Sequence, residues 1–231
     1  MKNCAVILAS GTGSRIGLDI PKQFYKLNGK TLLEYSIEAF NSHAEISSVV
    51  IVSNPDFIDL TQDIALKYQK VRTIVNGGST RQKSSYNGIK ALEGKWVDNV
   101  LIHDAVRPFI NHKIIDNCIK ALKTYRAVNV AVAVSDTIIK TDENNIIKEV
   151  PERSLMKRCQ TPQCFNYSVI KEAHELAINE NYNSATDDCS LVLRYDLAPV
   201  YVTEGSEDNI KITYPSDITI AEDILNRINK L

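Results

Sequence analysis

The feature that most constrains the fold is an alternation of short apolar runs and amphipathic segments over the first 134 residues. The apolar runs are bounded by turn-forming residues and predict buried strands, at about 4–9, 48–52, 71–75, 98–102 and 128–134. Helices are predicted between them; one begins at a Thr31–Glu34 capping box and another at the N-cap residue Asn111. This alternation favours βαβ units and an α/β fold, with a mainly parallel twisted sheet flanked by helices.

The alternation stops after residue 134. Two β-like runs, 136–141 and 146–151, flank a polar turn and predict a hairpin. Because a lone hairpin is only marginally stable in water, we expect residues 136–158 to form an arm that packs on a partner subunit. The alternative is a flap folded back on its own domain. Beyond the arm we expect helices at 167–179 and from 186, a strand at 198–202 and a last helix packed through Ala221, Ile224, Leu225 and Ile228. No linker interrupts residues 1–231, which predicts one domain that carries this arm.

The first predicted strand leads into a glycine-rich loop. Its glycines, Gly11, Gly13 and Gly17, let the backbone adopt φ > 0 and let a ligand approach the main chain closely. Arg15 and Lys22 flank the second half of the loop. Exposed amide groups together with two cations make a site suited to polyphosphate.

Other interpretations of this loop follow from its spacing. The order G-x-G-x-x-x-G differs from the G-x-G-x-x-G of dinucleotide folds, which argues against an NAD-dependent reductase. No G-K-[ST] follows, which excludes a P-loop. An ordinary strand-to-helix turn stays open as the alternative without a ligand.

Two further polar loops follow predicted strands, at 76–85 and 103–108. Loops at the carboxyl ends of parallel strands build the ligand site of such sheets, so we expect them to share a crevice with the first loop. Asp104 is then a candidate Mg²⁺ ligand, because Mg²⁺ prefers carboxylates and phosphates; the alternative is a helix cap. Asp208 is the candidate second carboxylate, although Asp-Asn is also ordinary turn chemistry. Lys211 follows, where a cation can meet a second anionic substrate.

Composition limits the partners. Lys and Arg total 27 against 28 Asp and Glu, so no bulk charge recruits nucleic acid or an anionic membrane. Five scattered cysteines without C-x-x-C support neither a zinc site nor a disulfide framework, which favours the reducing cytoplasm. No apolar run approaches the ~18 residues of a membrane span. We expect His112 and His174 on the surface, and Trp96 in the core or at its rim.

A set of short motifs resembles those of the sugar-alcohol phosphate cytidylyltransferases, the family of the methylerythritol-phosphate and ribitol-5-phosphate enzymes. The set occurs in the family's order over nearly the whole chain, which makes it more specific than any single motif. The motifs are residues 8–15, 21–24, 77–78 with Arg81 and Ser84, 103–108, 136–137, 160–163, 186–188 and 208–213.

The resemblance implies a Rossmann-like nucleotidyltransferase fold and transfer of a cytidylyl group from CTP to a polyol phosphate, with release of pyrophosphate. It implies a homodimer in which the arm reaches the other subunit's site, and Mg²⁺ held by Asp104 with Asp208. The catalytic cations would be Arg15 and Lys22. The CTP-binding residues would be Leu8, Ala9, Ser10, Gly11, Thr12, Gly13, Gly78, Arg81, Ser84, Asp104 and Ala105. The acceptor would meet Thr137, Arg153, Thr161, Thr186 and Lys211.

The acceptor itself is open between two members of the family. The loop between Gly17 and Pro21 has three residues, a length similar to that of the same loop in the methylerythritol enzymes. Val106, the run 151–165 and residues 186–189 are closer to the ribitol-phosphate enzymes, which favours ribitol 5-phosphate as the acceptor. A nucleotide-binding regulatory module without turnover is a rival from another class, but the presence of Arg15, Lys22 and Asp104 counts against it.

Overall fold

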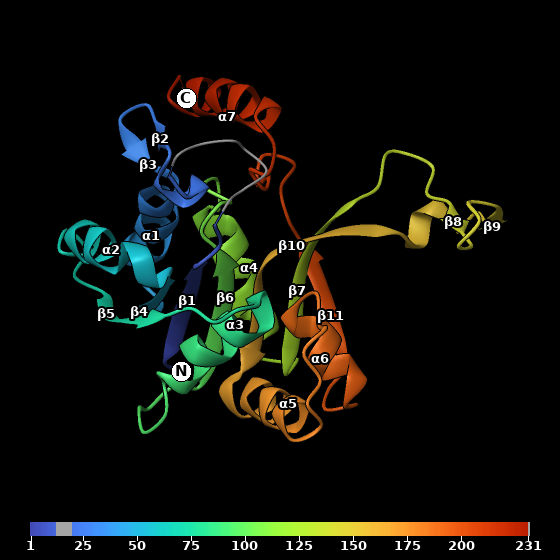
Figure 1. Ribbon diagram of the computed structural model, residues 1–231, viewed down its shortest axis with the longest axis horizontal. Coiled ribbons are helices and arrows are strands. Elements are labelled where there is room, and N and C mark those ends of the chain that lie inside the picture. Colours follow the sequence, from blue (N-terminus) through green and yellow to red (C-terminus); the bar gives the residue numbers. More distant parts are fainter. Residues whose placement is uncertain (13–19, 231) are drawn as a thin grey trace.

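The computed structural model describes residues 1–12 and 20–230 of the chain. Its centre is a seven-stranded sheet in the order β11-β7-β10-β6-β1-β4-β5 (Figure 1). The strands are β1 (Asn3–Ala9), β4 (Ile46–Ser53), β5 (Val71–Asn76), β6 (Asn99–Asp104), β7 (Ala127–Ala133), β10 (Lys157–Asn166) and β11 (Val200–Glu204). All neighbouring pairs are parallel except those that β10 makes with β6 and β7. The mainly parallel α/β sheet is therefore confirmed.

Strand β10 is absent from the sequence-based prediction. Its residues include a proline and several polar side chains, which hide the period-two pattern of a strand. Its pairing with β7 also shifts register between Cys159 and Gln163. This segment forms a strand because it pairs with both β6 and β7, and its local sequence contributes less.

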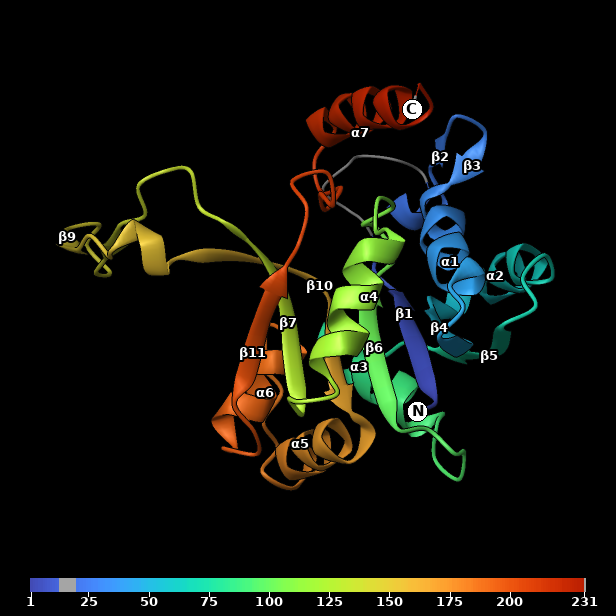
Figure 2. The same cartoon turned by 180° about the vertical axis from the view of Figure 1, so that it is seen from behind.

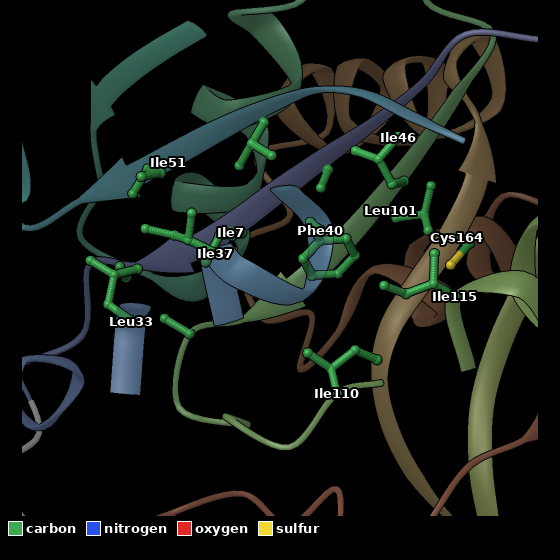
Figure 3. Packing of buried hydrophobic residues seen from close by; sticks show 14 of the residues in the cluster. Ile7, Leu33, Ile37, Phe40, Ile46, Ile51, Leu101, Ile110, Ile115 and Cys164 are labelled. Carbon is green, nitrogen blue, oxygen red and sulfur yellow. The ribbon is translucent and has the colours of Figure 1, made fainter. Parts of the chain in front are cut away.

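Helices cover both faces of the sheet: α1 (Leu32–Ser42), α2 (Ile58–Ala65) and α4 (His112–Ala121) on one, α3 (Arg81–Lys90), α5 (Tyr167–Asn179) and α6 (Asp188–Arg194) on the other. Alternate residues of β1 supply the two cores, because successive strand side chains point to opposite faces. Ile7 packs with Ile37 and Phe40 of α1, as Figure 3 shows, whereas Val6 packs with Ile89 on the α3 side. The capping box at Thr31 and the N-cap at Asn111 are both present.

The last helix, α7 (Ser216–Ile228), lies apart from the two main layers. It packs on the short hairpin of β2 (Lys26–Leu27) and β3 (Lys30–Thr31), where Ala221, Ile224 and Leu225 join a third apolar cluster (Figure 2). Ile228 is exposed, so the predicted apolar stripe of this helix is one residue too long. Within residues 1–12 and 20–230, three short 3₁₀ segments are present, at Lys22–Phe24, Pro55–Phe57 and Arg153–Leu155.

The predicted hairpin is present as β8 (Lys140–Thr141) and β9 (Ile147–Glu149), which pair with each other in a separate two-stranded sheet. Both strands are exposed, and Figures 1 and 2 show the hairpin projecting far to one side of the sheet. Apolar side chains on this arm, among them Ile139, Ile147 and Leu155, are exposed. The arm does not fold back on its own domain, which removes that alternative.

Two predictions about burial are wrong. His174 is 1% exposed because its ring is hydrogen-bonded to the buried Asp188. Trp96, expected in the core or at its rim, is 87% exposed. Among the described residues, none of the helices has the length and apolar character needed to cross a membrane.

Candidate functional site

A cavity of about 600 Å³ opens at the carboxyl ends of β1, β4, β5 and β6. The polar loops that follow these strands meet there, because parallel neighbours end at the same edge of the sheet. The predicted site residues that line it are Leu8, Ala9, Ser10, Gly11, Thr12, Lys22, Gly78, Arg81, Ser84, Asp104 and Lys211. The expected shared crevice is therefore present.

Direct contacts hold the first two loops against each other. The Ser10 hydroxyl donates to Oγ of Ser84 at 2.8 Å, and the backbone N–H of Gly78 donates to the same oxygen at 3.0 Å. A Cβ atom added at Gly77 would lie 2.2 Å from Cβ of Ser10, so only glycine permits this approach. Ser84 thus joins the loop after β1 to the loop after β5.

Gln23 is a site residue to which sequence reasoning assigned no role. Its side chain is buried, and its amide donates to the carbonyl oxygens of Ala9 and Gly11 at 2.7 and 3.0 Å. These two hydrogen bonds therefore fix the backbone at the start of the glycine loop. Lys22, the residue before it, is also buried and lines the cavity. The motif 21–24 was the available signal, but only contacts distant in sequence show what the glutamine does.

Asp104, the last residue of β6, faces two cations. Its Oδ2 atom is 2.7 Å from Nζ of Lys211, and its Oδ1 atom is 3.5 Å from Nε of Arg81. Burial by itself would raise the pKa of this carboxyl, but Arg81 and Lys211 outweigh it and hold the pKa well below its usual range. Asp104 is therefore ionised at neutral pH.

His103 and Thr161 form a hydrogen-bonded chain behind Asp104. The backbone N–H of Asp104 donates to the Thr161 hydroxyl at 3.1 Å, and this hydroxyl lies 3.0 Å from Nδ1 of His103. Nε2 of His103 lies 3.1 Å from the carbonyl oxygen of Arg107, which can only accept, so Nε2 carries the proton and Nδ1 accepts from Thr161. Burial lowers the pKa of His103 to about 4, so the ring is neutral.

This chain gives Thr161 a second role. Its hydroxyl is buried, donates to His103 and accepts from Asp104, and the residue is not among those that line the cavity. Thr161 thus supports the backbone of Asp104, and its contact with an acceptor stays a prediction.

Asp208 and Ala105 are also not brought into the cavity. The Asp208 carboxylate forms an ion pair with Arg227 of α7, which leaves Asp104 as the only one of the two expected metal ligands at the cavity wall. Ala105 is fully buried, and its N–H donates to the carbonyl oxygen of Leu8. It joins β6 to β1 and leaves no amide for a ligand.

The remaining predicted residues lie elsewhere or outside the description. Thr186 is exposed and does not line the cavity. Thr137 and Arg153 lie on the arm, where the guanidinium of Arg153 donates to the Thr137 hydroxyl at 3.0 Å. Gly13 and Arg15 fall within residues 13–19, outside the described residues.

The cavity thus combines Lys22, Arg81 and Lys211 with the ionised carboxylate of Asp104 and the backbone of the glycine loop, and Asp56 is a second acidic residue that lines it. This arrangement suits a polyanion with a phosphate chain. No group of three or more His, Cys, Asp or Glu side chains capable of holding a metal occurs in residues 1–12 and 20–230.

Comparisons with known proteins agree with this geometry. Residues 3–227 match the family model of IspD, 2-C-methyl-D-erythritol 4-phosphate cytidylyltransferase. The enzyme of that name from Clostridioides difficile is 44% identical over 223 residues, covering 96% of this chain and 92% of its own. That of Clostridium tetani is 40% identical over 232 residues, covering 100% and 93%.

A solved structure is similar along its whole length. The 4-diphosphocytidyl-2C-methyl-D-erythritol synthase of Anaerococcus prevotii has a TM-score of 0.87 and 31% identity, with 97% of this chain and 98% of that one covered. The Francisella tularensis 2-C-methyl-D-erythritol 4-phosphate cytidylyltransferase has a TM-score of 0.81 at 28% identity, with 97% and 100% covered.

Proposed function

This chain belongs to the 2-C-methyl-D-erythritol 4-phosphate cytidylyltransferase family and is a CTP-dependent cytidylyltransferase, and from that premise we propose 2-C-methyl-D-erythritol 4-phosphate as its acceptor. The relatives that span the full chain carry this name, and they favour it over the ribitol 5-phosphate that the sequence motifs suggested. The acceptor phosphate would attack the α-phosphorus of CTP, and pyrophosphate would leave.

The observation that carries the proposal is the convergence of Lys22, Arg81, Lys211 and Asp104 on one cavity beside the glycine loop. Phosphoryl transfer needs positioning and neutralisation of charge more than a nucleophilic side chain. The nucleophile is the acceptor's own phosphate oxygen, so the protein has to hold two anions in line and stabilise the charge that develops between them.

We assign the roles by position. The backbone of residues 9–12 would cradle the triphosphate, and Lys22 would stabilise the five-coordinate transition state together with Arg15. Gly78, Arg81 and Ser84, which also line the cavity, would hold the nucleoside side. Nζ of Lys211 contacts Oδ2 of Asp104, and this lysine would bind the phosphate of the acceptor.

The donor set fits Mg²⁺ in part. Mg²⁺ is bound by one or two carboxylates together with substrate phosphates and waters. Asp104 meets this requirement, because its ionised carboxylate is at the cavity wall. Asp208 is not among the residues that line the cavity, and its carboxylate pairs with Arg227. When bound with the nucleotide, Mg²⁺ would neutralise part of the triphosphate charge.

The arm supports a homodimer. Its apolar side chains Ile139, Ile147 and Leu155 are exposed, which is costly unless a partner covers them. We propose that the arm covers a second copy of the chain and carries Thr137 and Arg153 toward the partner's cavity. Acceptor binding would then depend on the dimer.

The acceptor is tested by pyrophosphate release from CTP and Mg²⁺ with three alternatives: 2-C-methyl-D-erythritol 4-phosphate, ribitol 5-phosphate and glycerol 3-phosphate. We expect the highest kcat/KM with the first. A higher kcat/KM with ribitol 5-phosphate would overturn the proposed acceptor while leaving the cytidylyltransferase activity in place.

A further inference from the structure

A buried carboxylate outside the cavity connects directly to its wall. Asp188, the first residue of α6, is 1% exposed and is not among the residues that line the cavity. Its Oδ2 atom accepts from Nη1 of Arg81 at 2.8 Å, although 107 residues separate the two. The sequence analysis included Asp188 in a motif but gave it no function.

Other donors fix the carboxylate itself. Its Oδ1 atom accepts from the Ser85 hydroxyl at 2.6 Å and lies 3.0 Å from Nε2 of His174. Its backbone N–H donates to Oε1 of Gln163 at 2.9 Å. Helices α3, α5 and α6 and strand β10 therefore meet at this one residue, so its carboxylate has little freedom to move.

Arg81 is held on two sides. Nη1 meets Asp188, and Nε lies 3.5 Å from Oδ1 of Asp104. Burial would lower the pKa of the guanidinium, but Asp188 and Asp104 raise it above its ordinary value, so its charge is permanent. Asp104 already pairs with Lys211. Without Asp188, Arg81 would turn toward Asp104 and compete with that lysine.

We propose that Asp188 is a positioning residue for the nucleotide: its carboxylate fixes the guanidinium of Arg81 on the cavity wall in the orientation that meets CTP. This inference rests on the proposed role of Arg81 in nucleotide binding. A free arginine side chain loses rotamer freedom when it is fixed. Asp188 fixes the Arg81 side chain before the nucleotide binds, so the entropic cost of ordering this side chain does not reduce the affinity for CTP.

The test measures the Kd for CTP by calorimetry without acceptor, together with kcat and both KM values, on the full chain. Asp188→Asn keeps the shape and removes the charge. Arg81→Lys keeps the charge but replaces the planar guanidinium, whose Nη1 and Nε face the two carboxylates, by a single ammonium nitrogen on a flexible stem. We expect each to weaken CTP binding about tenfold, and the double variant to be no weaker than either single. A merely structural role would lower the unfolding midpoint without this coupling.

Asp187→Asn is the matched control. It removes a neighbouring charge on the same helix, and asparagine caps a helix as well as aspartate does. Its carboxylate accepts from the backbone N–H of Ser190 and from Nε2 of Gln163, and it acts on Arg81 through charge alone, more weakly than Asp188 does. We expect its CTP affinity within about twofold of the unmodified protein, since an exchange without a contact to the site is close to neutral.

Three results would overturn the inference: unchanged CTP affinity in folded Asp188→Asn or in Arg81→Lys, additive losses in the double variant, or an equal loss in Asp187→Asn. If Asp188→Asn does not fold, Ser85→Ala decides, because it loosens the carboxylate without contacting Arg81. Weaker CTP binding in that variant supports the inference, and unchanged binding overturns it. An unmodified protein that binds CTP but transfers nothing to 2-C-methyl-D-erythritol 4-phosphate would break only the acceptor proposal.

Discussion

The ammonium group of Lys211 lies 2.7 Å from Oδ2 of Asp104, and 107 residues separate them in the chain. The same carboxylate faces Arg81 through its other oxygen. An anion at the end of β6 therefore holds one cation from the first turn of α3 and one from the segment after β11. This arrangement keeps both cations at the cavity before a substrate enters.

Lys211→Ala should weaken binding of the acceptor more than binding of the nucleotide. A charge-assisted hydrogen bond contributes about 1.5–3 kcal/mol, so we expect the acceptor KM to rise about tenfold or more. CTP binding should change less, because Lys22 and Arg81 are still present to interact with the nucleotide. Steady-state kinetics with each substrate varied in turn measures this. Lys113→Ala, an exposed lysine on α4, is the control. An acceptor KM equal to that of the unmodified protein would exclude the assigned role.

Lys22→Ala should lower kcat far more than CTP affinity. Lys22 lines the cavity beside the glycine loop, and a donor aimed at developing charge contributes about 10²- to 10³-fold in rate. Single-turnover kinetics together with calorimetry separates the two effects. Lys26→Ala, an exposed lysine four residues along the chain, should leave kcat unchanged. Turnover at the normal rate in Lys22→Ala would remove this lysine from the chemistry.

Mixing two inactive variants tests whether the arm serves the partner's cavity. In a heterodimer of Lys22→Ala and Arg153→Ala, one site would combine an intact cavity with an intact arm. Random exchange of subunits should then restore about a quarter of the full activity, because half of the dimers are mixed and half of their sites are intact. No recovery after confirmed exchange would show that each arm acts on its own subunit.

Gly88→Ala should destabilise the protein, although alanine favours helices. A Cβ atom at this position would lie 2.4 Å from Cγ1 of Val6 and 2.8 Å from Cγ2 of Val52. Overpacking costs about 1–3 kcal/mol, which exceeds the gain of about 1 kcal/mol in helix propensity. Urea unfolding measures the difference. In a Val6→Ala background the same substitution should cost less; an equal cost there would contradict the packing explanation.

His103 should make stability fall as pH drops from about 6.5 toward 4. Its pKa is lowered from 6.5 to about 4 in the folded protein, so below 6.5 the unfolded chain binds the proton first. The loss should approach about 3 kcal/mol by pH 4 and be absent above pH 7. We expect the urea unfolding midpoint to depend much less on pH across this range in His103→Gln than in the unmodified protein. His112→Gln, at an exposed histidine, should keep the pH dependence of the unmodified protein. An unchanged slope in His103→Gln would assign the pH dependence to another group.

Much of the fold could be predicted because its signals are local. Apolar runs identified the parallel strands, and the side chains of Thr31 and Asn111 cap helices where their spacing indicated. The loops after these strands share one cavity for a topological reason, since parallel strands end at one edge of the sheet. Strand β10 escaped prediction because its pairing with β6 and β7 compensates for a poor local pattern.

The sequence by itself determined the order of strands and helices, the caps, the glycine loop and the types of charged residue available to a phosphate. Only the tertiary structure decided which of them meet: Asp104 with Lys211, Arg81 with Asp188, Thr161 with His103, and Asp208 with Arg227. Propensities and caps depend on neighbours within a few residues, whereas these contacts join segments far apart in the chain. Their geometry follows from how the sheet and its helices pack.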